Sequence, residues 1–477
     1  MIDPDLLVPG AAQARRALDE AGWSAAALDD LLGATARTHL DRGELAPVLR
    51  RLRAAPPADR ALADLARLLV VGVPAERPTG LPGAWLAGDG TARLRLQPVR
   101  HGGVEVQVPH DPPGDDRDLV IGVGAASLTL AAATPRDVVG RVLDLGTGCG
   151  VQALLAEDHA RAVTATDRNP RAAAYARLAA ALHGQEWDVR TGDLLDPVAG
   201  ERFDLVVSNP PFVIGPAARY TYRDAGMAGD DVCRTLVERL PAHLAPGGTA
   251  VLLANWLHLE GEDGDARVRS WLAGTGCDAW VVQRELAAPE EYVTAWLRDT
   301  DEGFTTAYDA WLDALAGVEA VAFGVLALRE RSGRPGPGRV VLDAPDQPLA
   351  PTWGEQVGAH FAALDLADTD LRAARLRVRD DVRLHQVARR TDDGWSAEVQ
   401  LLQQEAGLRW SGGVDAYGAT LLAGCDGTRP LGDLLLVLAS SAGLSEGEAA
   451  EQVLPVVAEL VRQGFLVGGP PEAASST

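Results

Sequence analysis

The chain has 477 residues, 47% of them hydrophobic, and a formal net charge of −23, so it is long enough for about three domains with buried cores. All 44 Lys-plus-Arg positions are arginine, and the acidic balance opposes a protein that clamps many phosphates, although a local basic patch is compatible with it. No apolar run approaches the roughly 20 residues of a membrane span, and the first residues lack the regions of a signal peptide, so we expect a cytoplasmic protein without a membrane partner. The four cysteines are too scattered for a disulfide framework or a zinc site, and we expect no metal.

The first third of the chain predicts a helical domain followed by a hairpin. Residues 1–90 place apolar side chains at three- and four-residue spacing between Pro and Gly breaks, which is typical of amphipathic helices. In residues 91–135, polar and apolar residues alternate around His101-Gly102-Gly103, which predicts two paired strands. A short helix is expected to follow and to end at Pro135.

From residue 136 onward the pattern changes to alternating strands and helices. This alternation is typical of an α/β domain with a doubly wound, mostly parallel sheet, which we expect to extend to residue 329. A linker rich in Gly, Pro and Arg at 330–340 separates it from an α+β C-terminal domain at 341–467, expected to bind a partner or substrate. The tail, 468–477, is predicted to be disordered.

Three glycines end the first strand of this domain in the stretch VLDLGTGCG. Gly146, Gly148 and Gly150 allow the backbone to turn tightly and to approach a ligand closely. The spacing is G-x-G-x-G, and the third glycine comes one position too early for a dinucleotide fingerprint. Asp144 precedes the first glycine and would repel a pyrophosphate, so the loop favours a cofactor with a cationic end.

Acidic residues also end the next two strands. Asp167 in TATDRNP lies where a carboxylate can accept hydrogen bonds from both ribose hydroxyls of a nucleoside, while Asn169 and Pro170 are suited to begin the helix that follows. Asp193 in TGDLLDP could accept a bond from an adenine amine. Each acid alone could be an ordinary cap or turn residue, but three at successive strand ends favour a nucleoside site.

These residues, together with NPPF at Asn209–Phe212, resemble the motifs of class I S-adenosylmethionine-dependent methyltransferases over residues 142–255. The resemblance implies a Rossmann-like, seven-stranded sheet and S-adenosyl-L-methionine as cofactor. It also implies that the cofactor is held by the following residues: Asp144, Gly146, Thr147, Gly148, Gly150, Asp167, Arg168, Asp193, Leu194 and Asn209. In such enzymes a helix preceding the glycine loop lines the pocket, and Ser127 and Thr129 are candidates there, although small residues on a packed helix explain them equally well.

NPPF is predicted to hold the group that is methylated. The Asn209 side-chain oxygen and a backbone carbonyl could each accept one N–H of a planar amine and turn its lone pair toward the methyl group. Pro210 and Pro211 stiffen the turn because each fixes φ and lacks an N–H, and Phe212 offers a flat face for stacking. The motif is typical of methylation at a planar nitrogen. Tyr220, Tyr222, Arg223 and Asp224 could cover the acceptor or belong to a surface loop.

The acceptor itself has two candidates. Phe at position 212 and an accessory domain are similar to ribosomal-RNA guanine and adenine methyltransferases, so we expect an exocyclic amine of an RNA base. The alternative is a protein glutamine, as in release-factor methyltransferases, or a peptide nitrogen, because those enzymes share a helical N-terminal domain and an acidic charge suits a protein partner. A remote alternative is a non-catalytic cofactor-binding scaffold, which the intact motifs oppose.

The C-terminal domain contributes one basic segment. Leu371–Arg390 holds seven arginines against two aspartates, with Arg375, Arg377 and Arg379 expected on one face of a strand. They could grip phosphates, or they could form a solvated face of a sheet, since no aromatic residues interleave with them. The later segment around DGTR resembles winged-helix modules and favours a partner-binding role.

Overall fold

The computed structural model describes residues 2–216, 229–297, 304–334, 336–367, 369–392 and 394–469. The chain divides into two compact units. The first comprises Met1–Ala131 with Asp137–Leu342, and the second comprises Ala132–Arg136 with Asp343–Thr477. Within the described ranges, no helix is both long and apolar enough to cross a membrane.

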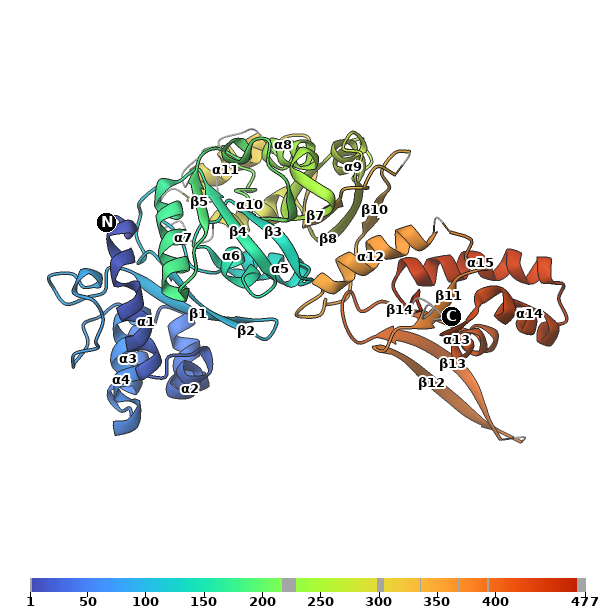
Figure 1. Ribbon diagram of the computed structural model, residues 1–477, viewed down its shortest axis with the longest axis horizontal. Helices are drawn as coiled ribbons and strands as arrows, with labels where there is room; N and C mark the ends of the chain where they lie inside the picture. The colour runs from blue at the N-terminus through green and yellow to red at the C-terminus, as the bar shows by residue number, and fades with distance from the viewer. Residues whose placement is uncertain are drawn as a thin grey trace, which may run out of the picture. The chain divides into compact units, whose positions relative to one another are not determined.

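A single large sheet forms the centre of the first unit (Figure 1). Its strands, in order across the sheet, are β10 (Val340–Asp343), β8 (Asp278–Ala287), β9 (Val318–Arg329), β7 (Leu244–Leu259), β6 (Phe203–Ser208), β3 (Val139–Leu145), β4 (Ala160–Asp167) and β5 (Asp188–Thr191). The pairs β3–β4, β3–β6, β4–β5 and β6–β7 are parallel, whereas β9 is antiparallel to both of its neighbours. The predicted α/β sheet is therefore confirmed.

The sheet has one strand more than the seven expected. β10 begins at Val340, at the end of the stretch assigned to a linker, and joins the sheet beside β8. The backbone N–H of Ala279 donates to Arg339 O at 2.8 Å and brings this segment to the sheet edge. Pro and Gly in Arg331–Gly338 indicated a break in regular structure, but the short apolar run after them was too brief to identify as a strand.

Helices cover both faces of this sheet. The helices that follow the N-terminal region are α5 (Ala125–Ala133), α6 (Val151–Ala156), α7 (Pro170–His183), α8 (Asp231–Arg239), α9 (Ala266–Ala273), α10 (Pro289–Leu297) and α11 (Phe304–Ala314), with short 3-10 turns at Asp196–Val198 and Leu240–His243. Side chains of α8 and α9 pack with Leu143, Val206 and Leu252 of the strands, whereas α6 and α7 pack in a separate core. α7 begins as expected: Asn169 caps it by accepting from Arg171 N, and Pro170 is its first residue.

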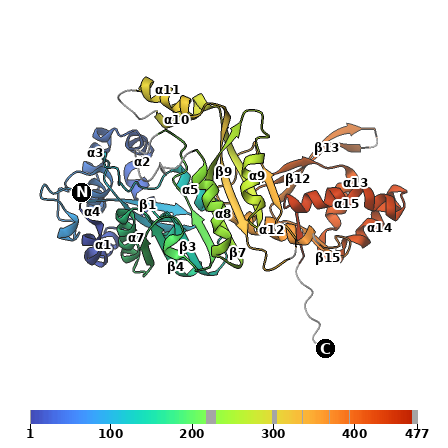
Figure 2. The ribbon, with the colours of Figure 1, turned by 90° about the horizontal axis from the view of Figure 1, so that it is seen from above.

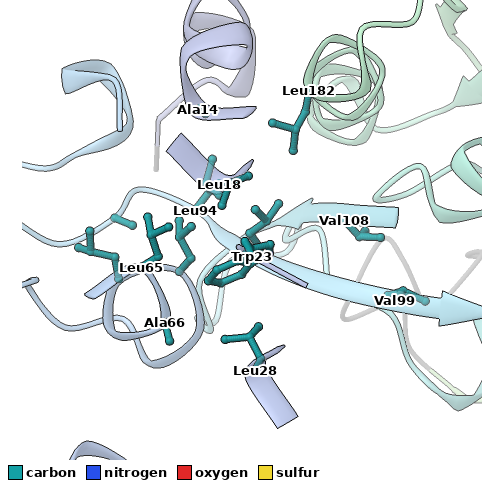
Figure 3. Packing of buried hydrophobic residues seen from close by; sticks show 14 of the residues in the cluster. Ala14, Leu18, Trp23, Leu28, Leu65, Ala66, Leu94, Val99, Val108 and Leu182 are labelled. Carbon is teal, nitrogen blue, oxygen red and sulfur yellow. The ribbon is translucent and has the colours of Figure 1, made fainter. Parts of the chain in front are cut away.

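The core of α6 and α7 continues into the N-terminal region. That region contains η1 (Pro4–Gly10), α1 (Ala11–Glu20), α2 (Ala25–Asp41), α3 (Leu45–Arg53), η2 (Pro57–Asp59), α4 (Arg60–Ala66), η3 (Arg67–Val71), η4 (Gly83–Trp85), β1 (Arg95–His101) and β2 (Val104–His110). The predicted hairpin is confirmed, since His101 pairs with Val104 around the two glycines. Figure 3 shows Trp23 between Leu28, Leu65 and Val108, and Leu182 of α7 belongs to the same cluster. The N-terminal helices and the hairpin thus share one core with α6 and α7.

The second unit contains two small sheets and four helices among its described residues. Its elements are α12 (Gly354–Ala367), β11 (Arg375–Val378), β12 (Val382–Thr391), β13 (Gly394–Gln404), β14 (Ser411–Gly413), α13 (Ala416–Gly424), β15 (Asp426–Pro430), α14 (Leu431–Ala442), α15 (Glu446–Arg462) and β16 (Leu466–Gly468). One sheet has the order β15-β11-β16 and the other β12-β13-β14. The strand expected to carry three arginines ends at Val378, so Arg379 lies beyond it, where its N–H donates to Phe465 O.

Candidate functional site

A cavity of about 340 Å³ opens where β3, β4 and β6 end at their carboxyl edges. This is the edge at which parallel α/β sheets bind ligands. Most of the residues singled out from the sequence line it, namely Asp144, Gly146, Thr147, Gly148, Asp167, Arg168, Asp193, Leu194, Asn209, Pro210 and Pro211. Gly150 and Phe212 are not among its lining residues.

The glycine loop needs its glycines for different reasons. Gly146, Gly148 and Gly150 all have positive φ, at 74°, 54° and 81°, a region that residues with a Cβ rarely adopt. The N–H groups of Gly146 and Thr147 both donate to Thr166 O at 2.9 Å, which binds the loop to the end of β4. A Cβ at Gly150 would lie 3.3 Å from the Trp187 ring, so this glycine serves the packing of α6 and lies away from the cavity.

Asp144 lies at the buried end of the cavity and is only 1% exposed. Its Oδ2 accepts bonds from Thr147 Oγ1 at 2.7 Å and from Ala153 N at 3.0 Å. Burial raises the pKa of this carboxyl to about 7, against the opposing effect of the two hydrogen bonds. A buried carboxylate whose charge is poorly compensated by the protein is suited to a cationic ligand group.

The Asp167 carboxylate is oriented by two backbone amides. Oδ2 accepts from Gly148 N at 2.9 Å and Oδ1 accepts from Asn169 N at 2.8 Å. The residue as a whole is only half-buried, but its carboxylate is enclosed, and burial raises its pKa while these amides oppose the shift. The cavity therefore has a second acid with a fixed orientation.

Asp193 and Leu194 form the rim of the cavity beyond β5. Leu194 has a φ of 44°, which is uncommon for a residue with a side chain, and the N–H of Asp196 donates to Asp193 O at 3.0 Å. Asp193 and Arg168 are both exposed. The three acids thus lie at or just beyond the carboxyl ends of three neighbouring strands, with Asp144 the most buried and Asp193 the most exposed.

Asn209 follows β6 directly and brings NPPF to the glycine loop. Ser208 anchors the strand end by donating from Oγ to Leu145 O at 2.9 Å, and a Cβ at Gly146 would lie 3.9 Å from Asn209 O. Asn209 Nδ2 lies 3.5 Å from Ser127 Oγ, at the limit of a hydrogen bond. The Asn209 backbone carbonyl is therefore next to the glycine loop.

The remaining sequence candidates lie in three different settings. Phe212 is half-buried and packs against Phe323, with ring centroids 5.5 Å apart. Ser127 lines the cavity, and its carbonyl accepts from Gln152 Nε2 at 2.7 Å, whereas Thr129 is not a lining residue. The four residues considered as an acceptor cover, Tyr220, Tyr222, Arg223 and Asp224, lie outside the described residues.

The resemblance to the methyltransferases placed the segment before the glycine loop at the pocket and named Ser127 and Thr129 there, but the residues that begin this segment form another wall of the cavity. Leu119, Val120, Ile121 and Gly122 line it, although no motif marks them. The cause of their position is Asp111, which is 2% exposed: its Oδ2 accepts from Val120 N at 2.9 Å, and its own N–H donates to Val120 O.

Helix α7 fixes Asp111 in turn. Arg171 Nε donates to Asp111 Oδ2 at 2.7 Å, and Tyr175 Oη donates to Oδ1 at 2.7 Å. Asn169 Nδ2 adds a bond to Asp118 O at 2.9 Å. Arg171 and Tyr175 lie about 60 residues from Asp111 in sequence, so no local pattern could have indicated the contact.

The arginines of Leu371–Arg390 are largely paired with acids. At least five of the seven form ion pairs with described residues of the second unit: Arg372–Glu446, Arg377–Asp380, Arg379–Asp381, Arg383–Glu405 and Arg389–Glu398. Most of these groups are exposed, where an ion pair contributes little stability and exchanges readily with other charges. Among the described residues, no group of three or more His, Cys, Asp or Glu side chains is arranged to hold a metal ion.

Comparison with known proteins adds sequence relatives. Residues 122–262 match the family model described as the methyltransferase small domain. Residues 20–91 and 359–468 match two models that are each described as a domain of unknown function.

Several curated relatives align with the same region. A release factor glutamine methyltransferase of Xylella fastidiosa is 38% identical over 161 residues, covering 31% of this chain and 56% of the relative. A ribosomal RNA small subunit methyltransferase C of Alcanivorax borkumensis is 33% identical over 116 residues, covering 24% of this chain and 32% of the relative. The chain thus spans about half, or less, of the length of these relatives.

Among solved structures, a T. thermophilus 16S rRNA methyltransferase in complex with AdoMet and guanosine has 18% identity and a TM-score of 0.31, covering 60% of this chain and 70% of that one. The family match is the informative comparison, because it includes the glycine loop, the acids and NPPF. The similarity to the methyltransferase small domain thus extends over the stretch of the chain that contains most of the cavity-lining residues.

Proposed function

We propose that the chain is an S-adenosyl-L-methionine-dependent N-methyltransferase that acts on a planar sp² nitrogen. One observation carries the proposal: the acids that suit the cofactor and the Asn209-Pro-Pro turn that suits the acceptor line the same cavity. A cofactor site without the turn would serve a binding protein equally well. Together they form a site in which two reactants can be held in contact.

The residues present fit the cofactor. Asp144 suits the cationic α-amino end, the glycine loop permits close approach of the ligand to the backbone, and Asp167 is oriented to accept from the two ribose hydroxyls. Asp193 lies at the outer rim, where the adenine would be. When bound, S-adenosylmethionine supplies a methyl group on a sulfonium, which is transferred by in-line displacement.

The NPPF turn would orient the nitrogen that receives the methyl group. The Asn209 side-chain oxygen and a backbone carbonyl of the turn are each able to accept one N–H of a planar –NH₂. Holding both hydrogens favours a pyramidal nitrogen with its lone pair directed into the cavity. No general base is needed, because the product ammonium is strongly acidic.

The first candidate acceptor is an exocyclic amine of an RNA base. It is supported by the ribosomal RNA methyltransferase among the relatives and by a second unit whose arginines could exchange their exposed carboxylate partners for phosphates. Such an enzyme would act in the cytoplasm.

A protein glutamine side chain is the second candidate. The observation that favours it is the ion pairing of five arginines in Leu371–Arg390, which reduces the positive charge available for RNA in a chain of net charge −23. Release factor glutamine methyltransferases are also among the relatives, at 36–38% identity.

Two measurements test the proposal. Calorimetry with S-adenosylmethionine should give saturable binding, and no heat for the wild type would overturn the function. Incubation of the enzyme with methyl-labelled cofactor and a cell extract should then transfer label. Loss of label after RNase treatment indicates an RNA acceptor, whereas label that stays in protein indicates glutamine. Binding without any transfer would support the scaffold alternative.

A further inference from the structure

The segment that follows NPPF is attached to an insertion between β8 and β9. This insertion contains α10 and α11, which lie side by side (Figure 2). The backbone N–H of Ile214 donates to Tyr292 Oη of α10 at 2.8 Å, and the two residues are 78 positions apart. Ile214 is 4% exposed and Tyr292 is 7% exposed, so the bond is made out of contact with water.

The Tyr292 hydroxyl also joins this contact to the sheet. Asn255 of β7 donates from Nδ2 to Tyr292 Oη at 3.2 Å. Asn255 is 2% exposed, and its Oδ1 accepts no bond within the described part of the chain. Tyr292 thus connects a strand of the central sheet with the backbone just beyond Asn209–Phe212, the turn proposed to hold the methyl acceptor and called the acceptor turn below.

Aromatic side chains of the insertion fill the space around this bond. The Tyr292 ring lies 6.5 Å from the Trp311 ring of α11, and a Cβ at Gly215 would lie 2.8 Å from Trp311. Only a glycine permits such an approach of the backbone to the indole. Ile214, Val293 and Leu315 belong to the same buried cluster.

The acceptor turn is consequently held at both ends. On one side, Ser208 Oγ donates to Leu145 O at 2.9 Å; on the other, Ile214 N donates to Tyr292. Between these two anchors, Pro210 and Pro211 each have a fixed φ, and Phe212 packs on Phe323. A shift of the Ile214 backbone is therefore transmitted through a stiff segment to Asn209.

We propose that the α10–α11 insertion sets the position of the acceptor turn, with Tyr292 as the positioning residue. This inference rests on the proposed methyl transfer. Tyr292 does not line the cavity, so it acts through the Ile214 backbone and through Asn209. Methyl transfer depends steeply on the alignment of the nitrogen, whereas cofactor binding would depend on the acids and the glycine loop that line the cavity.

The test replaces Tyr292 by Phe, which removes one oxygen and keeps the ring. The N–H of Ile214 is then left buried without an acceptor. We expect the exchange of the Ile214 amide with deuterium to accelerate and the rate of methyl transfer at saturating cofactor to fall by about tenfold or more, while the Kd for S-adenosylmethionine stays within about twofold of the wild type. Tyr308→Phe is the matched control, since Tyr308 is the phenol of α11 and packs in the same cluster; it should leave the rate unchanged.

Three outcomes would overturn the inference. Unchanged transfer by Tyr292→Phe would show that the bond does not position the acceptor. A parallel loss of cofactor affinity, transfer rate and thermal stability would show that Tyr292 only stabilises the fold. An equal loss in Tyr308→Phe would assign the effect to general packing. A wild type that binds no cofactor would instead overturn the proposed function, and this inference with it.

Discussion

The backbone amide of Gly148 donates a hydrogen bond to Asp167 Oδ2 at 2.9 Å. The bond joins the glycine loop after β3 to the acid at the end of β4, and the N–H of Asn169 holds the other carboxylate oxygen. An acid held on both oxygens keeps its orientation before a ligand arrives, so little rotamer freedom is lost when a ligand binds. The glycine loop and the acid therefore act as one preformed site.

Replacing Asp167 by Ala should weaken cofactor binding by about 30-fold, corresponding to the loss of about 2 kcal/mol from hydrogen bonds to a charged acceptor. Calorimetric titration measures the change. Asp188→Ala is the control, because Asp188 is an exposed acid on β5 that pairs with Arg190 outside the cavity. Equal affinity of the Asp167 variant and the wild type would contradict the assigned role.

Replacing Asn209 by Ala should leave the Kd for the cofactor within about threefold and reduce methyl transfer by at least about 100-fold, because one of the two N–H acceptors is lost. Asn209→Asp keeps a side-chain oxygen and should retain more activity than the Ala variant. Single-turnover transfer of labelled methyl measures both. A matching loss of binding and transfer in the Ala variant would argue against the acceptor role.

Removing the Tyr175 hydroxyl should loosen the cavity wall formed by Leu119–Gly122. Tyr175→Phe deletes one bond to the buried Asp111, and we expect cofactor affinity to fall by about fivefold, equivalent to about 1 kcal/mol. Arg177→Ala lies on the same helix but removes an ion pair with Asp5 instead, and it should leave the affinity unchanged. Calorimetry with both variants separates an effect on the wall from a general effect on α7.

Cofactor affinity should rise with pH until Asp144 is ionised. Burial raises the pKa of Asp144 to about 7, so below that value a cationic ligand must displace a proton, and affinity should drop by up to about tenfold per pH unit. Asp144→Asn should abolish this dependence. Burial also raises the pKa of Glu157 to about 7, but this carboxyl accepts a bond from Trp187 and does not line the cavity. Any dependence of the affinity on Glu157 would therefore remain in the Asp144→Asn variant, which distinguishes the two acids.

The raised pKa of Asp144 also makes the stability of the unliganded protein fall with pH, whereas the cofactor affinity rises. A carboxyl with a raised pKa in the folded state favours the neutral form, so its contribution to stability is present below about pH 4 and is lost as the pH rises through about 7. Relative to Asp144→Asn, the wild type should therefore become less stable over that range. Thermal unfolding of the unliganded proteins at a series of pH values measures the difference; a constant difference would show that Asp144 does not titrate in this window.

Local patterns were sufficient for the elements that surround the cavity. Asp144, Asp167 and Asn209 lie at or directly after the carboxyl ends of three parallel strands. Parallel strands bring these ends to one edge of the sheet, so the positions of the three residues at a common cavity could be predicted. Asn169 and Pro170 likewise marked the start of α7. β10 was missed because a strand of four residues is too short to show a recognisable alternation of polar and apolar side chains.

The sequence by itself determined the alternation of strands and helices that forms the α/β sheet, and the placement of the candidate acids and of Asn209–Phe212 at the ends of its strands. Only the tertiary structure decided what supports them. The bonds of Asp111 to Tyr175 and of Ile214 to Tyr292 join residues 64 and 78 positions apart. Such contacts leave no periodicity, because a buried hydroxyl or carboxylate acquires its role from the groups that folding brings beside it.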